Sequence, residues 1–268
     1  MSSDILQRHN VKVIGHGQPA VVLAHGFGCD QRMWRFIAPE LARHHQVVLF
    51  DYMGCGQSDI RHWTPAHYQS LGDHARDLNE IIDALGLSRV VLIGHSMSAS
   101  IGVLACVARP ELYQRLIQIG PNPCFINQGE YVGGFERADI MDLLDLMDRN
   151  MIGWANFFAP FAMKNDDRPE LGDELKRSIC QGEPDIVKQL ARQVFMADVR
   201  AWLPKVSVPS VILQCADDTV APPSVGDYLQ QHLPDAVLHR LRATGHCPHM
   251  SHPEETLAVL MQDRGQWV

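Results

Sequence analysis

Short apolar segments alternate with amphipathic ones from the start of the chain to about residue 120. Strand-like segments, rich in apolar and β-branched residues, occur at 11–14, 20–24, 47–52, 90–93 and 116–119. Between them, apolar positions recur with helical spacing over 31–44 and 68–85, and a run of small residues over 99–108 also predicts a helix. This alternation predicts right-handed crossovers and a mostly parallel sheet flanked by helices, an α/β fold.

The alternation stops between residues 125 and 203, where no segment has the pattern of a strand. Helical periodicity predicts helices there over 137–150, 151–163, 170–181 and 185–199. Strand patterns resume at 208–215 and 236–241, with helices over 224–233 and 253–262. We therefore expect a core formed by 1–124 and 204–268 and a helical cap, or lid, formed by 125–203. Such a cap would cover the carboxyl ends of the strands, where open α/β sheets bind ligands.

Composition narrows the classes of partner and compartment. The formal net charge of −8 argues against nucleic acid and anionic membrane surfaces as partners. The seven cysteines are scattered without a CxxC pair, which is typical of free thiols in a reducing compartment. The first residues lack the features of a signal peptide, and no apolar run approaches membrane-spanning length. These features predict a cytoplasmic location.

The most distinctive local motif is the segment 94–98, Gly-His-Ser-Met-Ser, between the strand 90–93 and the helix 99–108. A serine at a sharp strand-to-helix turn among small residues is the pattern of a nucleophile elbow, which exposes the serine hydroxyl at the edge of a sheet. Ser96 is the candidate nucleophile. The last position of the motif is Ser98, where the common form has glycine.

A nucleophilic serine needs a base and a carboxylate that orients the base. Asp217 and Asp218 follow the strand 208–215, and His246 follows the last strand. The chain order serine, acid, histidine is that of α/β-hydrolases, and parallel strands would bring all three to one edge of the sheet. Spacing alone does not choose between Asp217 and Asp218.

Backbone N–H groups are the candidate donors to an oxyanion. The N–H of Met97 follows the elbow, and that of Phe27 lies in the turn after the strand 20–24, where flanking glycines permit close approach. We interpret His25 as a residue that hydrogen-bonds locally in that turn and His95 as a structural residue beneath the elbow.

Two other readings of the motifs are weaker. His246, Cys247, His249 and His252 could form a metal cluster, but Pro248 and Pro253 break the helical spacing of ligands and no remote ligand is indicated. The glycine-rich turn at 54–59 has aspartate where a dinucleotide-binding motif needs its third glycine. We expect no metal and no cofactor.

The quoted motifs resemble the α/β-hydrolase superfamily, and more narrowly the RsbQ-type bacterial stress-signalling hydrolases and the related plant karrikin and strigolactone receptors. The matching stretches are 25–30, 50–52 with the glycines after it, 94–98, 213–218 and 245–253. The resemblance implies a four-helix cap inserted between strands, Asp218 as the acid, and Ser98 as the form found in the plant receptors. It also implies a pocket lined by Phe27, Phe125, Phe135, Trp154, Phe158, Phe195 and Val220.

Two functions follow as expectations. The first is a serine hydrolase acting on a small hydrophobic ester or lactone. The second, from a different class, is a signalling or receptor protein that acts through a regulatory protein partner containing a PAS domain, with slow or incidental hydrolysis. A haloalkane dehalogenase is disfavoured because residue 96 is serine, not aspartate.

Overall fold

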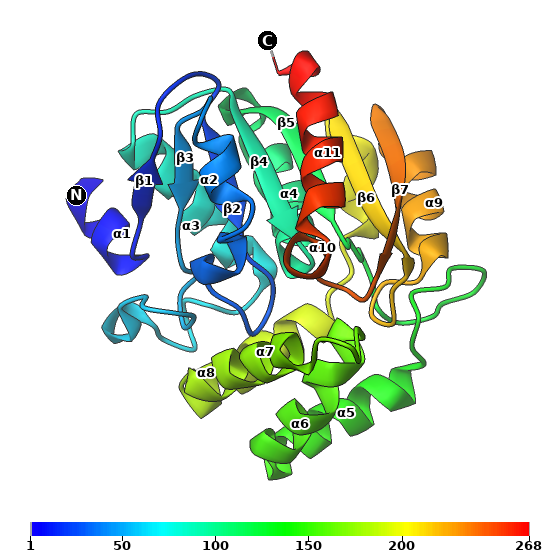
Figure 1. The fold of residues 1–268 in the computed structure, drawn as a ribbon. Coiled ribbons are helices and arrows are strands. Elements are labelled where there is room, and N and C mark those ends of the chain that lie inside the picture. Colours follow the sequence, from blue (N-terminus) through cyan, green and yellow to red (C-terminus); the bar gives the residue numbers. More distant parts are fainter. Residues whose placement is uncertain (1, 268) are drawn as a thin grey trace.

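The computed structural model describes residues 2–267 and contains one seven-stranded sheet with the order β1-β3-β2-β4-β5-β6-β7 (Figure 1). The strands are β1 (Lys12–Ile14), β2 (Val21–Ala24), β3 (Val47–Leu49), β4 (Val90–His95), β5 (Tyr113–Ile119), β6 (Ser210–Asp217) and β7 (Ala236–Thr244). Only β1, at one edge of this sheet, pairs antiparallel to its neighbour. The predicted mostly parallel α/β sheet is confirmed.

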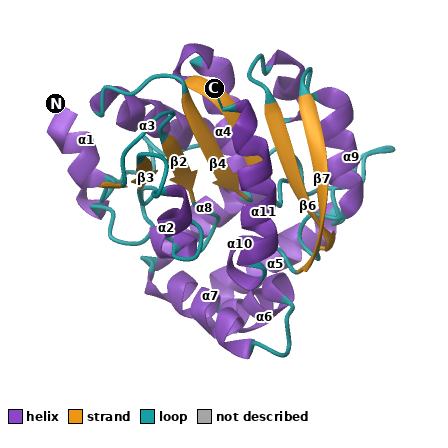
Figure 2. Ribbon diagram, turned by 45° about the horizontal axis from the view of Figure 1, so that its top comes forward, coloured by secondary structure: helices purple, strands orange, loops and turns teal. Residues whose placement is uncertain are grey.

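Helices cover both faces of the sheet, as Figure 2 shows. The α-helices outside the 125–203 segment are α1 (Ser2–Arg8), α2 (Ala38–Leu41), α3 (Leu71–Ala84), α4 (Met97–Ala108), α9 (Pro223–His232), α10 (Pro248–Ser251) and α11 (Pro253–Asp263). Helices α3 and α4 lie on one face, and α2 and α11 lie on the other (Figure 1). All six residues of β4 are buried, as expected for a central parallel strand with helices on both sides.

The packing of α4, the helix that follows β4, depends on its residue composition as much as on its hydrophobic periodicity. Most residues of α4 are buried, and several are alanine, serine or glycine, which lets the helix lie close to β4 and β5. At Gly102, an added Cβ would lie 2.8 Å from a methyl group of Leu116 on β5. The small residues therefore hold the helix, and the Ser96 corner that begins it, tightly against the sheet.

Four helices separate β5 from β6 in the chain: α5 (Arg137–Arg149), α6 (Met151–Met163), α7 (Pro169–Gln181) and α8 (Pro184–Phe195). They form a layer across the end of the sheet at which the parallel strands terminate (Figure 1). Between β5 and α5 the chain makes only isolated bridges and no ladder strand, in line with the sequence pattern. The limits of this layer at residues 125 and 203 stay a prediction.

The prediction of one helix over 31–44 was wrong. The structure has a 3-10 turn at Gln31–Trp34 and then the short helix α2. The reason is Pro39, the second residue of α2, which has no N–H to continue a helix from the preceding turn. Helix α1 was not predicted because its one buried side chain in the described part, Ile5, gives no recurring apolar pattern. No helix within residues 2–267 is long and apolar enough to cross a membrane.

Candidate active site

The corner between β4 and α4 places Ser96 in a backbone conformation that residues other than glycine rarely adopt. Its φ is 54° and its ψ is −116°, and its N–H donates to the Ile119 carbonyl of β5 at 2.9 Å. An added Cβ at Gly94 would lie 2.6 Å from the Ser98 carbonyl oxygen, so the turn closes only with glycine there. Strain of this kind persists where the surrounding structure imposes it, and it concentrates at functional sites.

The structure brings Ser96, His246 and Asp218 into one buried chain of hydrogen bonds. His246 Nδ1 lies 2.8 Å from Asp218 Oδ2, and His246 Nε2 lies 2.7 Å from Ser96 Oγ. A carboxylate only accepts, so Nδ1 carries the proton and Nε2 is free to accept the Ser96 hydroxyl proton. The three residues are between 4% and 7% exposed, which leaves little water to compete for these bonds.

The choice between the two aspartates, which spacing left open, has a geometric answer. Asp218 turns inward, and its second oxygen, Oδ1, accepts the backbone N–H groups of Val220 and Ala221 at 2.8 and 3.0 Å. These bonds fix the carboxylate plane while Oδ2 faces His246. The Asp217 side chain is 57% exposed and pairs with Lys164 at the end of α6.

The loop that carries His246 is docked on the C-terminal turn of α6. The His246 N–H donates to the Ala162 carbonyl at 2.8 Å. An added Cβ at Gly245, whose φ is +83°, would lie 2.1 Å from the Met163 carbonyl oxygen. The inserted helical layer therefore contacts the loop of the histidine directly, and only glycine permits so close an approach.

Two further imidazoles lie behind His246. The His95 ring is 5.0 Å from the His246 ring and 4.5 Å from that of His249, which packs on Trp34 at 4.7 Å. His95 Nε2 donates to the His246 carbonyl at 2.9 Å, which gives His95 the structural place predicted for it. Burial lowers the pKa of His95 well below its usual value and that of His249 to about 3, so both rings are neutral at pH 7.

These residues do not form the alternative metal cluster. His252 Nδ1 contacts the Ser251 hydroxyl at 2.9 Å, while His249 faces the aromatic core. Within residues 2–267, no three histidine, cysteine, aspartate or glutamate side chains are placed to hold a metal ion together.

The candidate oxyanion donors flank Ser96. Met97 is the first residue of α4, where a helix leaves its N–H without an intrahelical partner. Phe27 lies in the turn after β2 and lines the cavity above Ser96. An added Cβ at Gly26 would lie 2.4 Å from His95 Nδ1, so this turn approaches the elbow only because residue 26 is glycine. His25 is buried and bonds locally, its Nδ1 lying 2.9 Å from the Gly26 carbonyl oxygen.

The cavity above Ser96 is small and mainly apolar. Its volume is about 20 Å³, enough for one or two waters. Most of the residues expected to line the pocket do so: Phe27, Phe125, Phe158, Phe195 and Val220. Trp154 and Phe135 lie outside the lining. Trp154 is fully buried and stacks on the back of Phe158 at 4.6 Å, and Phe135 packs toward Phe161.

Residues 21–259 match the model of the Alpha/beta hydrolase family. The chain belongs to this family. It is 38% identical to "Strigolactone esterase D14" from Arabidopsis thaliana over 96% of both chains. It is 36% identical to "Karrikin insensitive 2 receptor CA" from Petunia hybrida over 96% of this chain and 95% of that one. A hydrolase from Oleispira antarctica has a similar structure, with a TM-score of 0.95, 42% identity and coverage of 97% and 96%. The resemblance to α/β-hydrolases and to these plant receptors is confirmed.

Several residues of this α/β hydrolase line the cavity although the sequence did not predict them there: Cys29, Ala162, Leu175, Val194 and Cys247. Cys29 and Cys247 lie close in sequence to Phe27 and His246. Their place in the lining could therefore have been predicted from these two neighbours. Leu175 and Val194 lie on the buried faces of α7 and α8, where helical periodicity predicts burial but not which cavity a side chain reaches.

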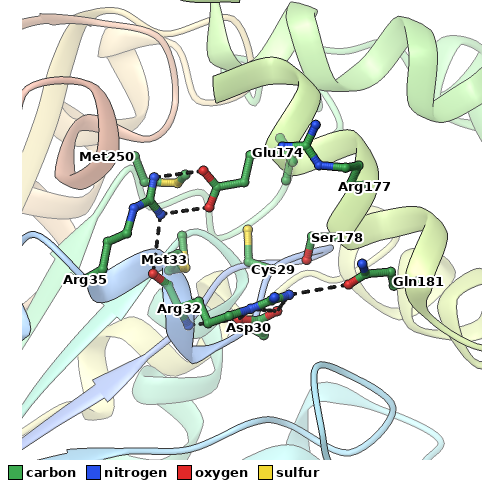
Figure 3. Close-up of a pocket in the computed structure, with 11 residues that line it drawn as sticks. Cys29, Asp30, Arg32, Met33, Arg35, Glu174, Arg177, Ser178, Gln181 and Met250 are labelled. Atoms are coloured by element: carbon green, nitrogen blue, oxygen red, sulfur yellow. Dashed lines mark hydrogen bonds and ion pairs between the residues drawn. The ribbon is translucent and has the colours of Figure 1, made fainter. Parts of the chain in front are cut away.

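A larger cavity of about 290 Å³ opens between the hydrolase core and α7 (Figure 3). Its rim carries the ion pair of Arg35 with Glu174, at 2.7 and 2.8 Å, and its lining includes the sulfur atoms of methionines 33 and 250. Cys29 and Leu175 line both this cavity and the one above Ser96. Those two side chains therefore lie between the cavity above Ser96 and the wider space beside it.

Burial of a neutral histidine makes the stability of the hydrolase depend on pH. His249 has a folded-state pKa of about 3, below the unfolded value of about 6.5. As the pH falls through this window, the unfolded chain binds a proton that the folded chain does not, so stability present above pH 6.5 is lost toward pH 3. We predict that His249→Leu makes the fall in unfolding free energy between pH 7 and pH 5 about 2 kcal/mol smaller. Urea titrations of the variant and the parent at both pH values measure this, and parallel pH dependence would contradict it.

Proposed function

We propose that the protein is a serine hydrolase that acts on a small hydrophobic ester or lactone. The observation that carries this proposal is the buried chain of hydrogen bonds from Asp218 through His246 to Ser96, which ends in an apolar cavity. A hydroxyl activated by a neutral imidazole, itself oriented by a carboxylate, is the arrangement that acyl transfer to serine requires.

In the proposed reaction, Ser96 Oγ attacks the carbonyl carbon and its proton passes to His246 Nε2. Asp218 stabilises the resulting imidazolium and holds its Nδ1–H. The N–H groups of Phe27 and Met97 bind the oxyanion of the tetrahedral intermediate. When that intermediate collapses, the ester C–O bond breaks and His246 gives its proton to the leaving oxygen. Water then attacks the acyl group on Ser96, and His246 accepts its proton. The bond between the acyl carbon and Ser96 Oγ breaks, His246 returns the proton to Oγ, and the acid is released.

The walls of the cavity define the substrate class. The ring of Phe195 lies 5.8 Å from that of Phe27 and 5.4 Å from that of Phe125, so aromatic faces from the core and from α8 meet above Ser96. These walls favour an uncharged, compact acyl group or a small ring. Because the cavity has a volume of only about 20 Å³, the aromatic side chains must move apart to admit even a short ester.

A second candidate function is favoured by the relatives. Proteins 36–39% identical to this chain over most of its length are named both as esterases and as karrikin insensitive 2 receptors. We therefore also consider a ligand-triggered signalling protein, in which the inserted helices present a surface to a regulatory protein with a PAS domain. Both candidates use the same Ser96 chemistry and differ in whether the acylated or ligand-bound state persists.

One test of this proposal compares the two neighbouring aspartates. Asp218→Asn keeps the shape of the side chain but presents an amide donor to His246 Nδ1, which favours the wrong imidazole tautomer. We expect turnover of a short p-nitrophenyl ester to fall about 10⁴-fold. Asp217→Asn is the matched control, since it removes only the exposed contact with Lys164, and it should keep activity within about twofold. Equal activity in the two variants would contradict the assignment of the acid.

Another experiment distinguishes the two candidate functions. We expect the parent to hydrolyse many equivalents of a short ester and a butenolide and to return to its original intact mass when the substrate is consumed. Time-resolved product analysis and intact-mass spectrometry of one sample measure both quantities. An adduct that persists after about one equivalent has reacted would instead support the receptor.

A further inference from the structure

Ser98, the last residue of the elbow motif, has no role in the proposed reaction. Its side chain is completely buried, although a glycine without any side chain is the common residue at this position. It is the second residue of α4 and lies two positions from Ser96. A buried hydroxyl is costly unless its hydrogen bonds are made, so its partners indicate what it does.

The Ser98 hydroxyl connects the elbow to the turn that carries Phe27. Its Oγ contacts the carbonyl oxygen of His25 and lies 3.1 Å from the hydroxyl of Tyr52. The carbonyl can only accept, so the single Ser98 proton is donated to His25 and the Tyr52 hydroxyl donates to Ser98. Tyr52 is fully buried, which excludes water as a competing partner.

The ring of His25 fixes the next peptide of the same turn. The Tyr52 backbone N–H donates to His25 Nε2 at 3.1 Å, so the ring proton is on Nδ1 and is donated to the Gly26 carbonyl at 2.9 Å. Burial lowers the pKa of His25, which keeps the ring in this neutral form. The Cys29 N–H donates to the same carbonyl at 3.2 Å.

The carbonyl of Gly26 and the N–H of Phe27 belong to one planar peptide unit. Fixing the direction of the carbonyl therefore fixes the direction of the N–H, which points the opposite way in a trans peptide. Ser98 holds the peptide before this unit, and His25 holds the unit itself. Tyr52 supplies a donor to each of them, through its hydroxyl and its backbone.

We propose that Ser98 is a positioning residue that aligns the Phe27 N–H as an oxyanion donor, acting through the His25 carbonyl and supported by Tyr52. The inference rests on the proposed serine hydrolase function. A donor to the oxyanion acts mainly in the transition state, so misalignment lowers kcat and leaves KM nearly unchanged. Because the N–H is turned rather than deleted, the loss is smaller than the roughly 10²–10³-fold cost of removing an oxyanion donor.

The test compares Ser98→Ala with Ser100→Ala, which removes another buried hydroxyl from the same helix. Ser100 donates to the Asn122 carbonyl at 3.1 Å, and its hydroxyl makes no hydrogen bond to the turn of His25. For a short p-nitrophenyl ester, Ser98→Ala should lower kcat about tenfold with KM within twofold. The inhibition constant of a small aliphatic trifluoromethyl ketone, which forms a tetrahedral adduct with serine, should rise by a similar factor. Ser100→Ala should leave both quantities unchanged, whatever its effect on Tm.

Ser98→Gly is the second variant, because glycine is the common residue at this position. Its kcat and ketone affinity test the inference if Ser98→Ala does not fold. Both variants of Ser98 should show the loss of kcat and the weaker ketone binding. Retention of parental kcat and ketone affinity in folded Ser98→Ala or Ser98→Gly would overturn the inference and leave the hydrolase function intact. A parent protein that neither turns over esters nor binds the ketone would instead overturn the proposed function itself, and the inference with it.

Discussion

The backbone of Ser96 is the constraint on which the rest of the site depends. A serine with a φ of 54° is retained only because the surrounding elements leave it no other conformation. β5 accepts its N–H, Gly94 allows the turn to close on the Ser98 carbonyl, and the small residues of α4 hold the helix against the sheet. The result is a hydroxyl that stands clear of the sheet and meets His246 from the opposite loop.

Around this corner, each buried polar group is oriented by a hydrogen bond with a neighbouring group. Asp218 determines which nitrogen of His246 carries the proton, and the Val220 and Ala221 N–H groups orient Asp218. His95 holds the carbonyl of His246 with a ring that burial keeps neutral. In the proposed reaction, these groups already face the atoms on which charge would develop. Hydrogen bonds arranged in advance in this way stabilise a transition state most effectively.

The sequence predicted the site best where only a few residue types can do the required chemistry. A serine at a strand-to-helix corner, followed in chain order by an acid and a histidine after later strands, predicted the three residues that meet in the structure. The choice of Asp218 over Asp217 came from family resemblance, because local hydrogen bonds to Val220 and Ala221 have no sequence pattern. Trp154 and Phe135 were assigned to the pocket, but a large aromatic side chain packs equally well away from the cavity. Trp154, on α6, stacks behind Phe158, and Phe135, in the loop before α5, packs toward Phe161. Pro39 argues against a continuous helix over 31–44, because proline lacks the N–H that would join α2 to the preceding turn.

The site is formed by the inserted helices together with the core of the sheet. The end of α6 holds the loop of His246, and α8 supplies Phe195 to the cavity that the core opens at Ser96.

The central claim is that this assembly activates Ser96 as a nucleophile. The most direct test is to treat the parent and Ser96→Ala with a small fluorophosphonate and to locate any adduct by peptide mass spectrometry. The account predicts one phosphonyl group per parent chain, on Ser96, and none on folded Ser96→Ala. Labelling of the variant at the parental rate, or of the parent at another residue, would contradict it.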